Sequence, residues 1–241
     1  FYALVALSGL TMAIKQAAQN PATALAALAA AAVGAWLFVR RQHRLADPLL
    51  TFDIFRSRLF TGGVLAAAGG MFVLAGAELM TTQKLQLVDA LTPLAAGATV
   101  AVMALSAIPA SVLGGAYLHK IGFLPLIAGG FFGAVVGAVA LATGWTSIGM
   151  VLLGLSAGLV MSVSSIAIIG SAPMHRSGMA AGVEEVSYEL GTLITVALTG
   201  SLLQAALDRG ADYTAAYNQV IGVLAAGAAC FAVATWWCFR D

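Results

Sequence analysis

The stretch Gly178–Leu203, GMAAGVEEVSYELGTLITVALTGSLL, is long and apolar enough to cross a lipid bilayer, which takes about 20 residues. It nevertheless carries three carboxylates, Glu184, Glu185 and Glu189. An ionised carboxylate is costly within hydrocarbon, so such residues face the interior of a helix bundle or a water-filled path and by default mark a functional site. The stretch therefore predicts a membrane-spanning helix with a candidate site inside it.

The spacing of the three glutamates divides them between two faces of the predicted helix. Glu185 and Glu189 are four residues apart and share a face, whereas Glu184 is turned about 100° away and lies one turn before Tyr188. Acidic groups this close together in a poor dielectric cannot all stay ionised. We therefore expect at least one of them to bind a proton or to pair with a cation. The alternative is an ordinary charged helix start, which does not account for Glu189, about three turns in.

The composition of the whole chain predicts the same class of protein. Hydrophobic residues make up 61% of the 241 residues and charged residues 9%, whereas a soluble domain has about 25% charged residues. We predict an all-α integral membrane protein with about eight spans, at residues 1–17, 23–40, 60–81, 93–117, 122–143, 147–170, 178–203 and 217–239.

The distribution of Lys and Arg predicts the orientation of these spans. If the first span runs outwards from the cytoplasm, eight basic residues fall on the cytoplasmic side and three on the other. The positive-inside rule then predicts a multi-pass protein of the plasma (inner) membrane. The inner residues are Arg40, Arg41, Arg44, Arg56, Arg58, Lys120, Arg176 and Arg240, and the outer ones are Lys15, Lys84 and Arg209.

The predicted spans fall into two groups. Residues 1–39 are expected to form a transmembrane hairpin, and residues 60–241 a six-helix bundle. Between them, residues 40–59 are expected to form a cytoplasmic linker with a short interfacial helix, which Asp47 and Pro48 would start. Glycines four residues apart predict close helix contacts; they are Gly129, Gly133 and Gly137, Gly154 and Gly158, and Gly178 and Gly182.

Four further polar residues are candidates for a substrate path or a gate. Glu78 is expected near the outer interface, where partial hydration is the alternative to a cation site. Ser164 and Tyr188 either bond to neighbouring helices or line a substrate path. Lys120 lies in a predicted inner loop, Gly114–Pro125, and is either a positive-inside charge or a gating contact to a helix end.

The sequence gives no support for an enzyme, a metal protein or a nucleic-acid-binding protein. The three histidines, His43, His119 and His175, fall in separate predicted inner loops without metal-ligand spacing. There is no phosphate-binding glycine loop and no basic block with interleaved aromatic residues. We therefore expect no catalytic residues, no bound metal and no cofactor.

Three segments resemble a known family. Ala46–Gly63, Thr81–Val88 and Gly170–Gly191, the last containing VEEVSYELG, are similar to the fourteen-span drug:proton antiporters of the major facilitator superfamily. The closest resemblance is to the branch that exports quaternary ammonium compounds and methyl viologen. By this resemblance, residues 1–39 correspond to the central helix pair and residues 60–241 to the C-terminal six-helix bundle.

The resemblance implies a function as well as a fold. It implies part of a multidrug efflux antiporter, driven by the proton motive force, in which Glu184 and Glu185 handle protons or cationic substrate. Lys120 stands where the family's inner-loop motif often has Arg. The implied partners are membrane lipid, a lipophilic cation and an N-terminal six-helix bundle, because a start at Phe1 within an apolar stretch suggests a fragment.

Two alternatives remain open from the sequence. The same antiport machinery could export an endogenous metabolite, a siderophore or an antibiotic. The chain could also be a membrane scaffold that transports nothing, since alternating access needs one bundle to move against another.

Overall fold

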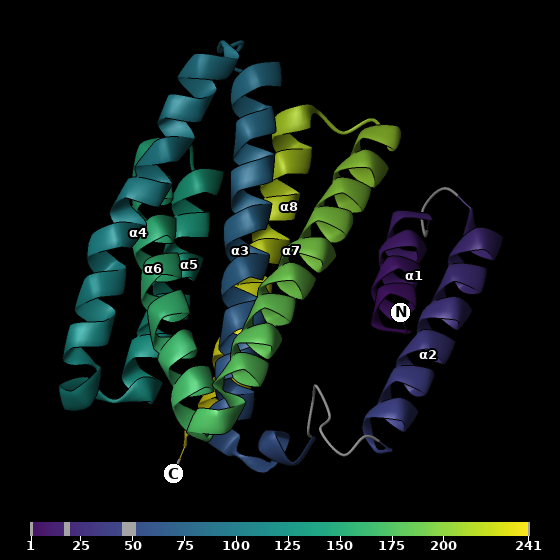
Figure 1. Ribbon diagram of the computed structural model, residues 1–241. Helices are drawn as coiled ribbons and strands as arrows, with labels where there is room; N and C mark the ends of the chain where they lie inside the picture. The colour runs from purple at the N-terminus through teal and green to yellow at the C-terminus, as the bar shows by residue number, and fades with distance from the viewer. Residues whose placement is uncertain (1, 17–19, 45–51, 241) are drawn as a thin grey trace. The chain divides into compact units, whose positions relative to one another are not determined.

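The computed structural model describes residues 2–16, 20–44 and 52–240 (Figure 1). The chain divides into two compact units, Phe1–Asp53 and Ile54–Asp241, with a boundary inside the predicted linker. Of that linker, the predicted helix start at Asp47 and Pro48 lies outside the described residues. Its described part contains a short 3₁₀ helix, η1 (Phe52–Arg56).

The first unit is a hairpin of two helices, α1 (Tyr2–Gln16) and α2 (Pro21–Gln42). Asn20 caps the start of α2 by accepting hydrogen bonds from two backbone amides of its first turn, and Pro21 needs no such partner. A side chain on Gly9 or Gly34 would meet the backbone of the facing helix. The hairpin is therefore held by close backbone contact. Helix α1 covers every described residue of the predicted first span, 1–17.

The second unit is a bundle of six long apolar helices, as the all-α membrane class predicts. In the part of the chain that the structure describes, seven helices, α2 included, have the length and composition to cross a membrane. The six are α3 (Arg58–Leu87), α4 (Pro93–Ile121), α5 (Phe123–Ala142), α6 (Thr146–Ser171), α7 (Ser177–Asp208) and α8 (Tyr213–Phe239).

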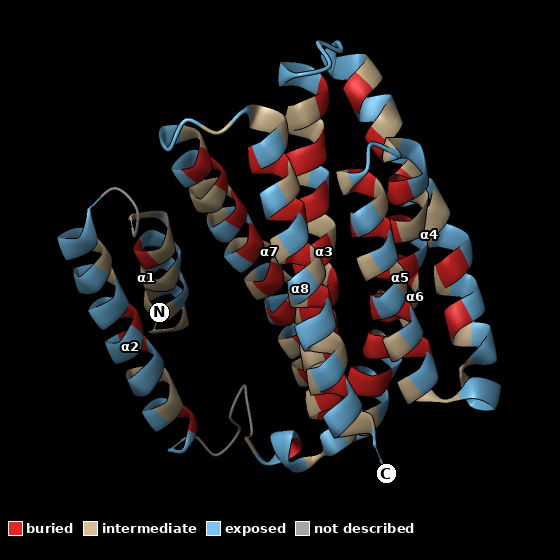
Figure 2. Cartoon of the chain, turned by 180° about the vertical axis from the view of Figure 1, so that it is seen from behind, coloured by how far each residue is buried: buried red, intermediate tan, exposed pale blue. Residues whose placement is uncertain are grey.

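Helices α3 and α6 form the centre of this bundle (Figure 2). Their most apolar windows are 56% buried, whereas that of α4 is 22% buried. Helix α6 packs against α3, α4 and α5, while α3 also contacts α7 and α8. The large apolar side chains that remain exposed on α4, such as Leu94 and Leu105, suit contact with lipid tails.

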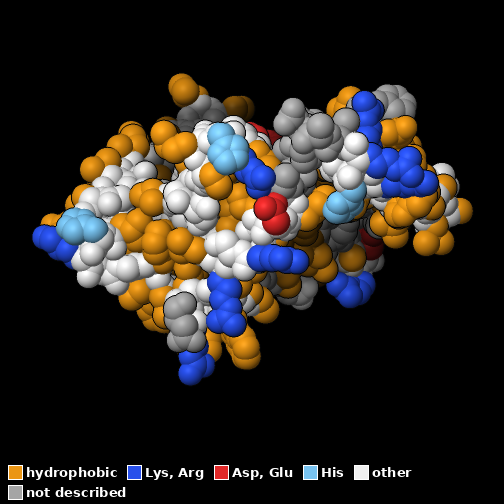
Figure 3. Space-filling model, turned by 60° about the horizontal axis from the view of Figure 1, so that its bottom comes forward, with side chains coloured by type: hydrophobic (Ala, Val, Ile, Leu, Met, Phe, Trp, Pro, Cys, Tyr) orange, Lys and Arg blue, Asp and Glu red, His pale blue; other side chains and the backbone are white. Residues whose placement is uncertain are grey.

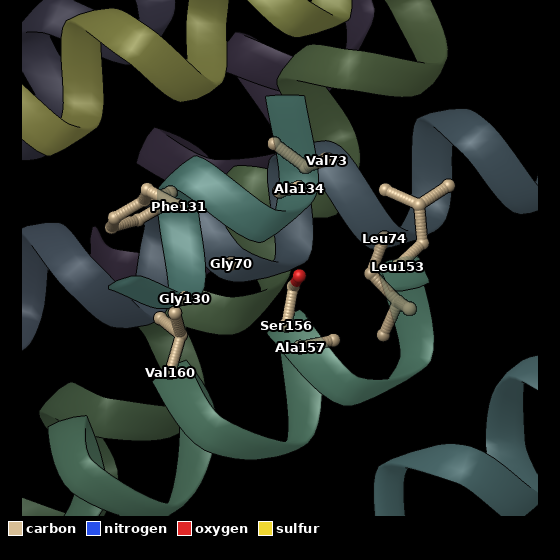
Figure 4. A pocket seen from close by; sticks show the side chains of 10 residues that line it. All are labelled: Gly70, Val73, Leu74, Gly130, Phe131, Ala134, Leu153, Ser156, Ala157 and Val160. Atoms are coloured by element: carbon tan, nitrogen blue, oxygen red, sulfur yellow. The ribbon is translucent and has the colours of Figure 1, made fainter. Parts of the chain in front are cut away.

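Glycines allow the helices of the bundle to approach each other closely. A Cβ atom on Gly154 or Gly158 of α6 would collide with the backbone of α4, at Met103 and Ala107 respectively. Where α3, α5 and α6 meet, the remaining gap measures only about 10 Å³ (Figure 4), which is at the lower limit for one water molecule. The bundle is therefore close-packed where these three helices meet.

The predicted glycine contacts are correct for α6 and only partly correct elsewhere. Gly133 and Gly137 of α5 face α6 at close range. Gly129, Gly178 and Gly182 have no atom within 4 Å of the position that a Cβ would take. These three glycines lie on faces that no described helix covers, so their spacing does not mark a contact within this chain.

The inner loop predicted at Gly114–Pro125 is wrong. Helix α4 continues to Ile121, and a single residue, Gly122, separates it from α5. Gly122 has φ of 88°, which glycine adopts without the steric cost that other residues bear. Lys120 consequently lies in the last turn of α4, with its ammonium group 5.7 Å from the centroid of the Tyr117 ring.

The helix ends at the bottom of Figure 1 agree with the predicted distribution of basic residues. This end of the bundle carries the start of α3, the end of α4 and the connection between α6 and α7. Figure 3 brings the bottom forward and shows Lys, Arg and His side chains spread over this end. For the bundle, the inner side predicted from the positive-inside rule is therefore one physical end of its helices.

At the opposite end, polar side chains join α3 to α8. The hydroxyl groups of Thr81 and Tyr217 lie 3.1 Å apart and are buried, and Tyr213 donates a 3.3 Å hydrogen bond to Gln83. The Lys84 ammonium lies 5.8 Å from the centroid of the Tyr217 ring. This network fixes the outer ends of the two helices against each other.

We expect Gly158→Ala to destabilise the chain, because the added methyl group meets the backbone of α4. Overpacking of this kind costs about 1–3 kcal/mol, and each kcal/mol lowers the unfolding temperature of a chain this size by roughly 2–4 °C. Tryptophan fluorescence of the purified chain in detergent would measure the shift. Gly129→Ala is the matched control: its methyl group meets nothing, so this variant should be neutral or slightly stabilised. Equal destabilisation of both variants would contradict the assigned contact.

Tyr217→Phe should also destabilise the chain, because it leaves the buried Thr81 hydroxyl without its partner across the helix interface. Interhelical hydrogen bonds in membranes are worth about 0.6 kcal/mol on average and up to about 1.7 kcal/mol. The same thermal measurement applies. The double variant Thr81→Val with Tyr217→Phe should lose less stability than the two single variants lose together, because both partners of the hydrogen bond are removed. A loss equal to or larger than the sum of the two single losses would argue against the pairing.

Candidate functional site

Helix α7 carries the three glutamates near the inner end of the bundle. Chain direction changes at Pro173, a short 3₁₀ helix follows at Met174–Arg176, and α7 begins at Ser177. Helix α6 ends at Ser171, and Pro173 disfavours the helical conformation of the residue before it. Glu184 then lies about 10 Å along α7 from its start, at 1.5 Å per residue.

One face of α7 is buried, and Glu184 belongs to it. The buried residues recur at intervals of three or four along the whole helix, as expected for one stripe of a helix. Glu184 is 9% exposed, while Glu185 and Glu189 are exposed. The members of the stripe are Ala180, Glu184, Ser187, Gly191, Thr195, Thr199, Leu203 and Ala206.

Glu184 is hydrogen-bonded to Tyr188, one turn further along the same helix. The Tyr188 hydroxyl donates to the Glu184 carboxylate over 2.8 Å, as the four-residue spacing predicts. Ser164 of α6 is fully buried, donates to the Met161 carbonyl over 3.0 Å and interacts electrostatically with the same Tyr188 hydroxyl. Glu184, Tyr188 and Ser164 thus form a polar cluster, which we call the Glu184 cluster, between α6 and α7.

The surroundings of the Glu184 cluster are apolar. Tyr188 packs against the buried group that contains Phe60 of α3, Ile168 of α6 and Ala180 of α7. Among the described residues, no Lys or Arg forms an ion pair with Glu184. A buried carboxylate without a cationic partner is uncommon within a membrane span and by default marks a functional site.

Glu185 and Glu189 lie on the uncovered face of α7. Both are exposed, and they are accompanied by apolar residues such as Val186 and Ile194, which are 42% and 46% exposed. A face that combines carboxylates with apolar side chains can contact a molecule that is both positively charged and hydrophobic. The structure therefore separates one buried carboxylate from two accessible ones on a single helix.

Glu78 occupies a different place, in a groove between α3 and α4. The groove has a volume of about 380 Å³ and is open to the outside. Its walls are mainly small apolar residues, with Glu78 as the single charged group. Glu78 is exposed, consistent with the expected hydration, and it lies on another helix from the Glu184 cluster. The lining residues are Leu74, Glu78, Thr82, Gly97, Val100, Ala101, Met103, Ala104 and Ala107.

The sequence indicated the glutamates but not their neighbours on other helices. The contact of Ser164 with Tyr188 joins α6 to α7 over more than twenty residues. The α4 wall of the Glu78 groove carries small apolar side chains. Side chains of this kind occur in every span of the chain, so no signal in the sequence marks this wall. The roles assigned to all six acidic, hydroxyl and tyrosine candidates, and to Lys120, stay predictions.

Comparison with known proteins identifies relatives over most of the chain, although no family model matches it. The sequence is 33% identical over 240 residues to the multidrug efflux pump LfrA of Mycolicibacterium smegmatis, covering 92% of this chain and 48% of the relative. It is 30% identical over 174 residues to the methyl viologen resistance protein SmvA of Salmonella typhimurium, covering 69% and 35% respectively.

A third relative is the drug efflux pump JefA of Mycobacterium tuberculosis, 30% identical over 206 residues, with 82% of this chain and 40% of the relative covered. The chain thus spans half or less of the length of each of these relatives. All three are named for efflux or resistance, and none for an enzymatic reaction. The chain belongs to the family of multidrug efflux and drug-resistance transporters that its sequence resembles, and is a multi-pass protein of the inner membrane.

Proposed function

We propose that the chain forms the C-terminal part of a proton-coupled exporter of lipophilic cations, working with an N-terminal six-helix bundle. The observation that carries the proposal is the arrangement of acids on α7. A buried carboxylate, Glu184, sits one residue from an exposed one, Glu185. The relatives' names support export of drugs, and methyl viologen, after which one of them is named, is a dication.

In this proposal Glu184 is the proton-binding group. Its carboxylate accepts one hydrogen bond, from Tyr188, and it is the buried acid of α7, with no ion pair to a Lys or Arg among the described residues. An acidic residue buried within a membrane-spanning helix is by default a functional group. We therefore assign proton loading and release to Glu184.

The exposed carboxylates Glu185 and Glu189 are the proposed contacts of the cationic substrate. A lipophilic cation would pair with them while its apolar part lies against exposed side chains of α7 such as Val186. A bound proton on Glu184 lowers the negative charge of the site, which weakens its attraction for a cation. Proton and substrate thereby compete without needing the same carboxylate, and this competition couples the two fluxes.

The groove at Glu78, between α3 and α4, also combines a carboxylate with apolar side chains. A single carboxylate within apolar walls suits a hydrophobic monocation, and the groove's volume of about 380 Å³ is within the range of small-molecule sites. Alternating access requires a second bundle that rocks against this one. The open faces of α7 and of the groove are the proposed sides of the substrate path, with the proton motive force as the only energy source.

We expect Glu184→Gln, made in the full-length transporter that contains this chain, to abolish proton-driven efflux while leaving the cation able to bind. Gln removes the titration and keeps the size of the side chain. Ethidium efflux from energised vesicles, with and without an uncoupler, measures the first effect, and a fluorescence titration of the purified protein with ethidium measures the second. Proton release on ethidium binding should be lost. Asp208→Asn, at the outer end of the same helix, is the matched control and should behave as the wild type.

Two results would contradict this role. Wild-type efflux from Glu184→Gln would remove Glu184 from the coupling, and normal proton release on binding would do the same. Uncoupler-insensitive efflux by the wild-type protein would contradict proton coupling itself. Absence of ethidium efflux, with the protein correctly inserted, would contradict the lipophilic cation and favour export of another class of compound.

Glu185→Gln and Glu189→Gln should instead weaken ethidium binding. An exposed ion pair at about 4 Å is worth about 1 kcal/mol, which corresponds to about a fivefold rise in Kd. Proton release per bound ethidium should persist in both variants, because Glu184 is intact. Fluorescence titration gives the Kd. Unchanged affinity in both variants would show that the exposed face of α7 does not hold the cation.

A further inference from the structure

The inner end of the α1–α2 hairpin contains a second charged pocket, unrelated to the acidic residues of the bundle. It has a volume of about 340 Å³ and is lined by Tyr2, Leu37, Arg40, Arg41 and Arg44. All five residues belong to the first compact unit, and no acidic residue lines the pocket. We call it the arginine pocket. Its size lies at the lower end of the range for small-molecule sites, about 300–1,000 Å³.

Aromatic rings lie beside two of the three arginines. The guanidinium carbon of Arg40 lies 5.2 Å from the centroid of the Trp36 ring, and that of Arg41 lies 5.9 Å from that of Tyr2. Arg44 follows the end of α2 in a turn, where its backbone amide bonds to the Arg41 carbonyl over 3.0 Å. All three arginine side chains are exposed and can reach an anion, and the ring contacts restrict two of the guanidinium groups, which lowers the entropic cost of binding.

The positive charge of the arginine pocket is not balanced by the described residues. None of the three arginines forms an ion pair with a described carboxylate. The carbonyl groups at the C-terminus of α2 contribute only about half a negative charge, against three formal positive charges. Like charges this close repel each other, so an anion bound between them would stabilise the end of the hairpin.

The position of the pocket indicates which anion this is. Helix α2 has 22 residues and the hydropathy of a membrane span, so its C-terminal arginines lie at the level of the lipid headgroups on the side with most basic residues. Trp36, one turn before Arg40, is 58% exposed and is typical of the membrane interface. Basic pockets between spans on the cytoplasmic side bind anionic headgroups, and arginine matches the geometry of phosphate oxygens.

We propose that the arginine pocket binds the phosphodiester headgroup of an anionic phospholipid of the inner leaflet. Leu37 is the aliphatic residue of the lining and would contact the apolar part of the lipid next to the headgroup. The lipid would fix the depth of the hairpin in the membrane, and this role is independent of proton or drug binding at α7.

The test uses the full chain, purified in mild detergent and titrated with phosphatidylglycerol, with phosphatidylcholine or with inorganic phosphate. Native mass spectrometry counts bound lipid, and tryptophan fluorescence follows the unfolding temperature. We expect retention of phosphatidylglycerol over phosphatidylcholine, and a loss of affinity of about fivefold for each of Arg40→Gln, Arg41→Gln and Arg44→Gln.

Arg240→Gln is the matched control, because Arg240 also lies over a tryptophan ring, 4.6 Å from the centroid of Trp236, but lines no described pocket with other arginines. It should leave lipid binding unchanged. Equal loss in Arg240→Gln would show attraction to basic charge anywhere on the inner side and would overturn the site. Equal binding of both lipids would overturn the headgroup preference, and equal stabilisation by inorganic phosphate would overturn the lipid as the ligand.

Discussion

Close approach of helix backbones is the constraint on which the bundle depends. Lipid tails are as apolar as leucine, so helices in a membrane gain little from hydrophobic burial and associate through packing and hydrogen bonds. Gly154 and Gly158 bring α6 onto α4, and Gly191 brings α7 onto the Ala68 carbonyl of α3. Gly191 is seven residues after Glu184 and therefore on the same face of α7. The glycine contact that holds α7 against α3 is thus also what buries Glu184.

Two other polar residues of the buried stripe differ from Glu184 in their hydrogen bonds. Ser187 donates to the Val183 carbonyl over 2.6 Å, and Thr199 to the Thr195 carbonyl over 2.7 Å. These two hydroxyls are satisfied within their own helix, whereas the buried Thr195 hydroxyl has no hydrogen-bond partner among the described residues. A carboxylate cannot donate to a carbonyl unless it is protonated. Glu184 therefore needs the Tyr188 hydroxyl, and it is the member of the stripe whose charge state matters.

The sequence was sufficient for the class of fold and for the helix that carries the acids, because both follow from hydropathy and from the cost of charge in hydrocarbon. It was not sufficient for the contacts between helices. Gly129 and Gly158 have the same four-residue spacing to a second glycine, yet only Gly158 meets another backbone. The difference lies in which face each helix turns to its neighbours, and a composition that is apolar all round does not encode that face.

The sequence was also insufficient for two further features, the segment around Lys120 and the burial of Glu184 and Glu185. Glycine, proline and charge at Gly114–Pro125 are typical of a loop, but a helix can carry all three near its end, and only Gly122 interrupts it. For Glu184 and Glu185, the sequence spacing predicts an angle of about 100° between the two side chains around the helix axis. Which of the two is buried depends on the rotation of α7 about its axis, and the contact of Gly191 with α3 determines this rotation.

This dependence has a consequence for the proposed coupling. Glu184 and Glu185 are neighbours in sequence, so they move together with α7. Glu184 becomes exposed to water only when α7 rotates about its axis or when its contact with α3 and α6 opens. Interfaces that pack backbone against backbone have discrete arrangements and deform little. Proton exchange at Glu184 would therefore accompany a shift of α7 past Ala68 and Ser164, while Glu185 stays accessible in both arrangements. A single helix could then link a proton inside the bundle to a cation on its surface.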